Sequence, residues 1–401
     1  MDLLRRARWL APLVLMRLLF VVALTGMTAG SAACAAESGE ITTKASHAIL
    51  MDADTGAIIF QRSADELFAP ASMSKLMTLA LVFRYLKKGQ LKPSDEFSVS
   101  VNAWKKGGAP SRTAAMMIPV NTKARLEELL QGIIVQSGND ACIVVAEGIA
   151  GSEAAFAKLM VEEARRIGLA KSTFANPTGL SDPNQRMTAK ELALLARYLI
   201  REFPEYYKMF SQRDFLYRKH KFINRNPLLF LNIGADGLKT GYLSESGYGI
   251  VGSAVQDGRR LIVVAAGLAT AADRKSEANK LLDWGFKSLT QVKLFDQNEV
   301  IGHARVWGGE QFYVPLVAKG ELTIVLPKYP ANQKLKAEII YRTPLKPPVR
   351  KGDEVAMLRV TSSSGAQNEV PLFAFQDVAP AGIMRKGLDS LVHLALRWIT
   401  L

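Results

Sequence analysis

Ser72 and Lys75 are the residues of this chain whose types and spacing first suggest chemistry. They lie in residues 69–78, where a serine is followed three residues later by a lysine at the predicted start of a helix. Residues three apart share one face of a helix, so the hydroxyl and the amine are expected to approach each other. A serine hydroxyl is a poor nucleophile at neutral pH without a base beside it. The pair therefore predicts a serine nucleophile with a lysine base.

Two further polar motifs follow in the chain, and together with them the Ser-x-x-Lys pattern becomes specific. A Ser-x-x-Lys pattern arises by chance about once in a chain of this length, so alone it has little specificity. The chain continues with Ser137-Gly138-Asn139 and then Lys239-Thr240-Gly241. Taken alone, Ser137-Gly138-Asn139 is a turn between two helices with a polar N-cap residue. A cation such as Lys239 near Lys75 would, together with burial, lower the pKa of Lys75 and make it a base.

The segments that must position these motifs predict an α/β domain. Residues 48–51 and 57–60 flank a Gly-containing turn and are expected to form a β-hairpin. Asp257-Gly258 marks a second hairpin, between strands over residues 249–255 and 260–268. Helices are expected over residues 70–88, 126–136, 141–149, 154–167, 188–203 and 276–289. The order of strands, helical block, strands and final helix fits an antiparallel sheet made from both ends of the domain, with helices packed on it.

Residues 1–36 predict a cleaved signal peptide. Three arginines among the first eight residues precede an apolar run, and small residues stand before Glu37. Arg17 interrupts the apolar run and disfavours a membrane span. A lipoprotein signal at Cys34 is also disfavoured, because Ser31 stands where an aliphatic residue is usual. We therefore expect an exported protein on the periplasmic side of a bacterial inner membrane.

Composition indicates a basic globular chain. Its 401 residues are 49% hydrophobic and 22% charged, enough for two domains with cores. Loss of residues 1–36 removes four arginines and one aspartate, so the net charge falls from +14 to +11. The cations are scattered and the chain is exported, so anionic lipid or an acidic wall polymer is a better expected partner than nucleic acid. Cys142 is then the only cysteine, which excludes an intrachain disulfide.

In this order and spacing, the three motifs resemble those of the serine penicillin-recognising enzymes. They resemble more closely the low-molecular-weight penicillin-binding proteins of the D-alanyl-D-alanine carboxypeptidase family. Residues 174–180 and 282–286 are supporting similarities, and the resemblance runs from about residue 40 to the C-terminus. It implies a β-lactamase/transpeptidase-like domain over residues 40–290, with an antiparallel sheet and a helical block.

The resemblance also implies roles for the motif residues. Ser72 would be the nucleophile, Lys75 its base, and Ser137 the relay of a proton to the leaving group. Asn139 would hold the peptide backbone of the substrate.

The third motif would form one wall of the site. By resemblance, Lys239, Thr240 and Gly241 line the substrate, with Thr240 binding its terminal carboxylate. The backbone N–H groups of Ser72 and Tyr242 would hold the oxyanion, and such a donor is typically worth about 3 kcal/mol. Tyr242 stands where the family often has histidine. Because this role uses only the N–H, the change leaves the chemistry intact but can alter substrate preference or pH response.

Arg274 stands where the resemblance places an arginine that helps Thr240 to clamp the carboxylate. The forked donors of a guanidinium suit a carboxylate. The alternative is a solvated arginine at the start of the helix that follows, and the sequence leaves both open.

The pattern changes from about residue 291. Short apolar runs with frequent Gly and Pro predict a small all-β, sandwich-like domain over residues 291–378, without a catalytic constellation. Residues 380–401 then predict an amphipathic helix that bears Trp398 and three cations. Such a helix suits a lipid interface, and its alternative is packing on the β domain.

Other chemistries lack a motif. The four histidines lie in no recognisable triad, and the chain shows no metal-ligand spacing and no phosphate loop, so no metal or cofactor is implied. The expected function is a serine D-Ala-D-Ala carboxypeptidase acting on peptidoglycan stem peptides and acylated by β-lactams. A β-lactamase, an endopeptidase on the same scaffold and a catalytically quiet wall-binding protein remain the alternatives.

Overall fold

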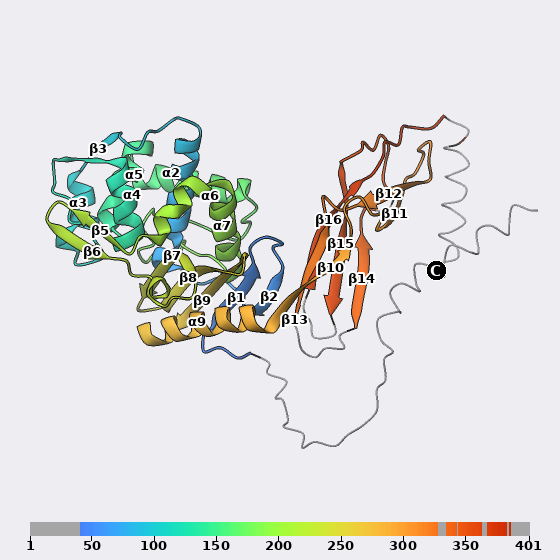
Figure 1. The fold of residues 1–401 in the computed structure, drawn as a ribbon. Coiled ribbons are helices and arrows are strands. Elements are labelled where there is room, and N and C mark those ends of the chain that lie inside the picture. The colour runs from blue at the N-terminus through green and yellow to red at the C-terminus, as the bar shows by residue number, and fades with distance from the viewer. Residues whose placement is uncertain (1–40, 328–333, 343, 363–366, 383–384, 386–401) are drawn as a thin grey trace, which may run out of the picture.

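The computed structural model describes residues 41–327, 334–342, 344–362, 367–382 and 385, drawn in colour in Figure 1. The expected signal peptide, residues 1–36, lies outside the described residues. So does the expected C-terminal helix, except for residues 380–382 and 385. Among the described residues, no helix is both long and apolar enough to cross a bilayer.

The first domain is built on an antiparallel sheet with the order β2-β1-β9-β8-β7. Its strands come from the two ends of the domain, as the sequence predicts: β1 His47–Asp52, β2 Ile58–Arg62, β7 Ala235–Leu243, β8 Gly247–Gln256 and β9 Arg259–Leu268. Both expected hairpins are confirmed, since β1 pairs with β2 and β8 with β9. Strand β7 ends this order, so its outer edge has no strand partner among the described residues.

Both faces of this sheet are covered. Alternate β1 residues point to opposite faces, because the side-chain period of a strand is two. Ile49 and Met51 enter the core shared with the helical block, whereas Ala48 and Leu50 enter a core shared with α9, Ala271–Ser288. Helix α9 begins five residues before the expected start at 276. In Figure 1 it runs along the sheet on the side away from the other helices.

The helical block carries two of the three motifs. Its centre is α2, Lys75–Lys87, ten of whose thirteen residues are buried, as expected for a helix surrounded by other elements. Around it lie η1 Ala71–Ser74, α3 Val101–Gly107, η2 Ala109–Ser111, α4 Leu126–Gln131, η3 Gly132–Gln136, α5 Asn139–Ala150, α6 Glu153–Arg166, α7 Ala189–Glu202, α8 Pro204–Tyr207 and η4 Lys208–Ser211. A further 3-10 turn, η5 Pro227–Phe230, lies on the other face of the sheet, where Leu228 joins the core shared with α9. Two small two-stranded sheets complete the block: β3 Glu96–Ser98 with β4 Lys123–Arg125, and the hairpin of β5 Asp214–Tyr217 with β6 His220–Ile223.

The second domain is all-β, as predicted. Its strands are β10 Leu289–Phe295, β11 Gly302–Arg305, β12 Tyr313–Val317, β13 Leu322–Pro327, β14 Leu335–Ile340, β15 Glu354–Ser362 and β16 Gln367–Ala374. They form a β10-β13 pair and a layer in the order β11-β12-β16-β15-β14. A separate apolar core joins the layers, with Ile324 from one and Leu316, Leu358 and Leu372 from the other.

Candidate active site

Ser72 and Lys75 stand where a tight turn becomes a helix. Ser72 lies in η1, a 3-10 turn, and Lys75 is the first residue of α2. In a 3-10 turn, side chains three residues apart eclipse each other, which brings these two close. The Lys75 Nζ lies 2.8 Å from the Ser72 Oγ. The contact predicted from the spacing is therefore present, although the turn is 3-10 rather than α-helical.

Lys75 is fully buried and its amine is held in place by three acceptors. Besides Ser72, it donates to the Asn139 Oδ1 at 2.7 Å and to the carbonyl oxygen of Thr178. Burial lowers the pKa of Lys75 to about 8, and the positive charge of Arg225 acts in the same direction. A neutral amine has two hydrogens for three neighbours, so its lone pair is free to accept the Ser72 proton. This arrangement suits a general base.

The Ser137-Gly138-Asn139 loop follows a π-helical turn, η3, and begins α5. Ser137 has a left-handed backbone, with φ of 65°, and its buried Oγ has no hydrogen-bond partner among the described residues. A buried hydroxyl without a partner is costly, so a substrate group that binds it is favoured. Asn139 contacts Lys75 through its oxygen, while its Nδ2 donates to the Thr113 Oγ1 at 2.9 Å.

Asp140 holds the Ser137-Gly138-Asn139 loop in place through hydrogen bonds to the backbone. Its carboxylate accepts the backbone N–H groups of Met116, Ile118 and Ala141 at 2.8, 3.2 and 2.9 Å. Burial raises the pKa of Asp140, against the lowering effect of these hydrogen bonds. The carboxylate thereby ties the loop to residues 116–118.

Strand β7 brings the third motif to the Ser72 turn. A Cβ on Gly241 would lie 3.0 Å from the Ala71 Cβ and from the Pro70 carbonyl oxygen, so glycine permits this close approach. Lys239 is 2% exposed, and Thr240 is also buried. Burial and the repulsion of Lys75 lower the pKa of Lys239 well below its ordinary value.

Tyr242 lies near the end of this strand, and Arg274 belongs to the first turn of α9. The Tyr242 side chain is 54% exposed, and its ring centre is 4.3 Å from that of Tyr248. The Arg274 guanidinium lies over the Tyr248 ring, 5.6 Å from its centre. Its buried Nε has no hydrogen-bond partner among the described residues, and burial lowers its pKa. The structure thus places Arg274 over Tyr248 of β8, the residue that pairs with Tyr242 of β7, and leaves its Nε without a partner in the described part of the chain.

The structure adds two groups that sequence reasoning missed. One is Arg225, just after β6, whose charge lowers the pKa values of both Lys75 and Lys239. No motif signals it. The other is the carbonyl of Thr178, which holds the Lys75 amine.

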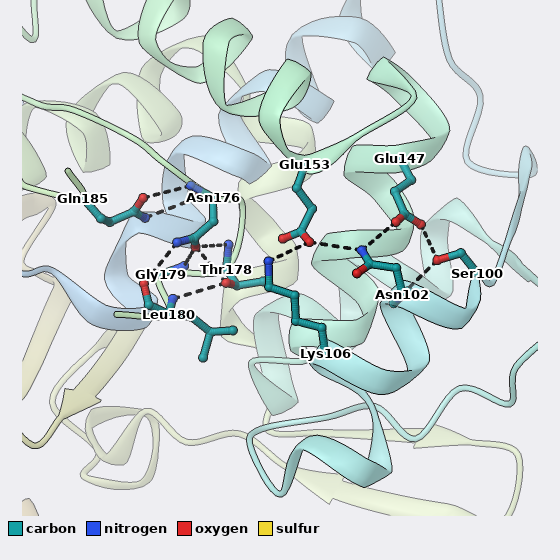
Figure 2. A network of polar contacts seen from close by, with 11 residues as sticks. Ser100, Asn102, Lys106, Glu147, Glu153, Asn176, Thr178, Gly179, Leu180 and Gln185 are labelled. Carbon is teal, nitrogen blue, oxygen red and sulfur yellow. Dashed lines mark hydrogen bonds and ion pairs between the residues drawn. The ribbon is translucent and has the colours of Figure 1, made fainter. Parts of the chain in front are cut away.

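Figure 2 shows how the Thr178 carbonyl is positioned. The Asn176 Oδ1 accepts the N–H groups of Thr178 and Gly179 at 3.1 and 2.8 Å, which makes a tight turn. Gln185 accepts the Asn176 N–H at 3.1 Å and donates to the Ser74 Oγ at 3.0 Å, joining the turn to η1. The Asn-Pro-Thr-Gly signal predicts a turn, but only the fold shows that the turn reaches Lys75.

The other network in Figure 2 holds α3 against α5 and α6. The Asn102 Nδ2 donates to Glu147 at 2.8 Å, and the Lys106 Nζ lies 2.9 Å from Glu153. Helix α3 leads to Thr113, which contacts Asn139. These bonds therefore support the loop that faces the site. No group of three potential metal ligands occurs among the described residues.

This architecture, with a serine, two buried lysines and an edge strand beside them, is that of a serine peptidase domain. A family model described as D-alanyl-D-alanine carboxypeptidase matches residues 32–270. A second, described as the C-terminal domain of penicillin-binding protein 5, matches residues 289–380. The chain belongs to the D-alanyl-D-alanine carboxypeptidase family, which confirms the resemblance and the fold class.

Relatives along nearly the whole chain support this assignment. The D-alanyl-D-alanine carboxypeptidase DacC of Escherichia coli is 34% identical over 388 residues, 94% of this chain and 97% of that protein. DacF of Bacillus subtilis is 30% identical and covers 89% of this chain and 93% of its own length.

Solved structures agree. Penicillin-binding protein 5 of Haemophilus influenzae has a TM-score of 0.73 at 33% identity, covering 85% of this chain and 99% of that one. The ampicillin-bound penicillin-binding protein D2 of Listeria monocytogenes has a TM-score of 0.54 at 28% identity, covering 62% of this chain and all of that one.

Proposed function

We propose that this protein is a serine D-Ala-D-Ala carboxypeptidase, which releases the terminal D-alanine of peptidoglycan stem peptides through an acyl-enzyme on Ser72. The observation that carries the proposal is the contact of the buried Lys75 amine, 2.8 Å from the Ser72 Oγ, in a chain of this family. The relatives named for this activity match along most of their length.

Both half-reactions use the groups that surround Ser72. Its Oγ attacks the carbonyl carbon of the penultimate D-alanine while Lys75 accepts the hydroxyl proton. The backbone N–H groups of Ser72 and Tyr242 hold the oxyanion. Ser137, whose Oγ is otherwise unpartnered, passes a proton to the departing amine, and D-alanine leaves. Water then attacks the ester with Lys75 again as base, which frees Ser72.

Substrate binding falls to β7 and its neighbours. The outer edge of β7 suits an extended peptide added as a further strand. Asn139 retains a second Nδ2 hydrogen for the peptide backbone, while Lys239, Thr240 and Gly241 form the facing wall.

We expect Arg274→Ala to weaken catalysis only where the substrate carries a terminal carboxylate. Its unpartnered Nε, in a guanidinium that lies over Tyr248, suits a clamp shared with Thr240. Loss of a charged hydrogen bond predicts about a 10- to 100-fold lower kcat/KM on a D-Ala-D-Ala peptide, and little change on an uncharged ester analogue. Equal losses on both substrates would remove the clamp role.

β-Lactams are expected to acylate the same serine, because they mimic the D-Ala-D-Ala terminus. The ampicillin-bound relative with the same fold supports this expectation. A β-lactamase would need a glutamate-bearing loop that hydrolyses the acyl-enzyme quickly, and the sequence between Ser137 and Lys239 shows no such motif.

The function is tested by incubating the protein with a pentapeptide that ends in D-Ala-D-Ala and measuring D-alanine release. A matched peptide ending in L-Ala is the control, and only the D-terminal peptide should be cleaved. Failure to release D-alanine while penicillin still acylates the protein would favour an endopeptidase or a wall-binding protein. Absence of both reactions would contradict the proposal.

We also propose that the protein is exported and bound to the periplasmic surface of the inner membrane through residues 380–401. Support comes from the sequence alone: an n-region and h-region at the start, and a Trp-bearing basic amphipathic pattern at the end. A chain that ends at Val378 should lose most of its binding to anionic vesicles. Unchanged sedimentation with vesicles would contradict the anchor.

A further inference from the structure

The rim of the active site carries a carboxylate that the reaction does not use. Glu245 lies in the turn between β7 and β8, directly beyond the strand that bears Lys239 and Thr240. Its side chain accepts a hydrogen bond from the hydroxyl of Ser181 and another from that of Ser244, at 3.1 Å. These hydroxyls, first that of Ser181, lower the pKa of Glu245, so the exposed carboxylate is ionised at neutral pH.

This contact joins the two segments that enclose the Ser72 turn. On one side Gly241 of β7 packs against Ala71, and on the other a Cβ on Gly179 would come within 2.0 Å of the Ala71 carbonyl oxygen. Ser181 follows Gly179 by two residues, and Glu245 follows Gly241 by four. Their hydrogen bond therefore spans one end of the site, beyond the nucleophile.

The direction in which the substrate binds determines which of its residues lies near the contact of Ser181 with Glu245. If Thr240 binds the terminal carboxylate and the Tyr242 N–H holds the reacting carbonyl, the peptide runs antiparallel to β7. Each further substrate residue advances about 3.3 Å toward the end of the strand at Leu243. The residue that precedes the two D-alanines then lies beside the turn that carries Glu245.

We infer that Glu245 is a specificity-determining residue that favours substrates with a positively charged amine on the side chain preceding D-Ala-D-Ala. The inference rests on the proposed function and adds a subsite to it. Arg186 is close enough to affect Glu245 electrostatically, but its Nη1 donates to the carbonyls of Asp182 and Gln185 at 3.2 and 3.0 Å. Because Glu245 is exposed, a substrate amine can approach its carboxylate from the solvent side.

The test compares two peptides, one with lysine before D-Ala-D-Ala and one with Nε-acetyl-lysine there. The unmodified protein should prefer the free amine by about 3- to 5-fold in kcat/KM, as expected for an exposed ion pair, with the difference in KM. The preference should shrink at high ionic strength. Glu245→Gln should remove it without changing kcat, and Glu245→Lys should reverse it.

Two controls separate charge recognition from a structural role. Asp257→Asn removes a carboxylate from the turn at the opposite end of β8 and should leave the preference intact. Ser181→Ala breaks the bridge but keeps the Glu245 charge, and should also retain most of the preference. Equal losses on both peptides in Glu245→Gln, or an unchanged preference, would overturn the inference while carboxypeptidase activity persists. If neither peptide is cleaved by the unmodified protein, the proposed function itself fails.

Discussion

Replacing Ser72 by alanine is expected to abolish D-alanine release and β-lactam acylation together. The substitution removes the oxygen that forms the acyl-enzyme, so the loss in kcat should be about 10⁴-fold or more. The packing of the turn rests on other groups, above all the approach of Gly241 and Gly179 to Ala71. The fold should therefore survive, which circular dichroism and thermal unfolding can check.

Ser74→Ala is the matched control for this loss. Ser74 lies on the same turn, where its hydroxyl donates to the Ala71 carbonyl at 3.0 Å and accepts from Gln185 at 3.0 Å. Its removal should lower stability by about 1 kcal/mol and leave acylation in place. D-Alanine release by the Ser72→Ala protein would show that another group is the nucleophile.

Replacing Lys75 by alanine is the second large expected effect. General bases typically contribute about 10²- to 10⁴-fold, so acylation of Ser72 by a β-lactam should slow by that factor at neutral pH. Lys75→Met keeps most of the buried volume, so it controls for the cavity that Lys75→Ala creates. Lys87→Ala, at the exposed end of the same helix, should acylate normally.

The pH dependence identifies the base in the same experiment. A pKa of about 8 means that Lys75 is mostly protonated at pH 7 and must lose its proton to act. The acylation rate should rise about tenfold per pH unit below pH 8 and level off above it. This rising limb should be missing in Lys75→Met. Normal acylation by Lys75→Ala at neutral pH would rule out the lysine-base role.

Much of the fold follows from local patterns. The hairpins of β1 with β2 and β8 with β9 are marked by turn residues, and the i,i+3 spacing foresees the contact of Ser72 with Lys75. Helix starts are less well defined, because α9 begins before its expected first residue. Its first turn, residues 271–275, has no buried apolar residues, so the hydrophobic pattern does not mark it as helical.

The site is harder to complete from sequence, because its remaining groups meet only through tertiary packing. The Thr178 carbonyl belongs to the backbone, so no residue type signals its contact with Lys75. Arg225 lies in a loop without a motif, although its charge lowers the pKa values of both lysines. The sequence predicts that burial and Lys239 together lower the pKa of Lys75. Burial is indeed the main cause, but the cation that lowers this pKa is Arg225, and the repulsion between the two lysines instead lowers the pKa of Lys239.

The acyl-enzyme on Ser72 is tested most directly by mass spectrometry of the protein after a short incubation with penicillin. One adduct per chain is expected, and proteolysis should place it on the peptide that contains Ser72. The Ser72→Ala protein should remain unmodified under the same conditions. An adduct on a different peptide, or D-alanine release by a protein that forms no adduct, would contradict the account.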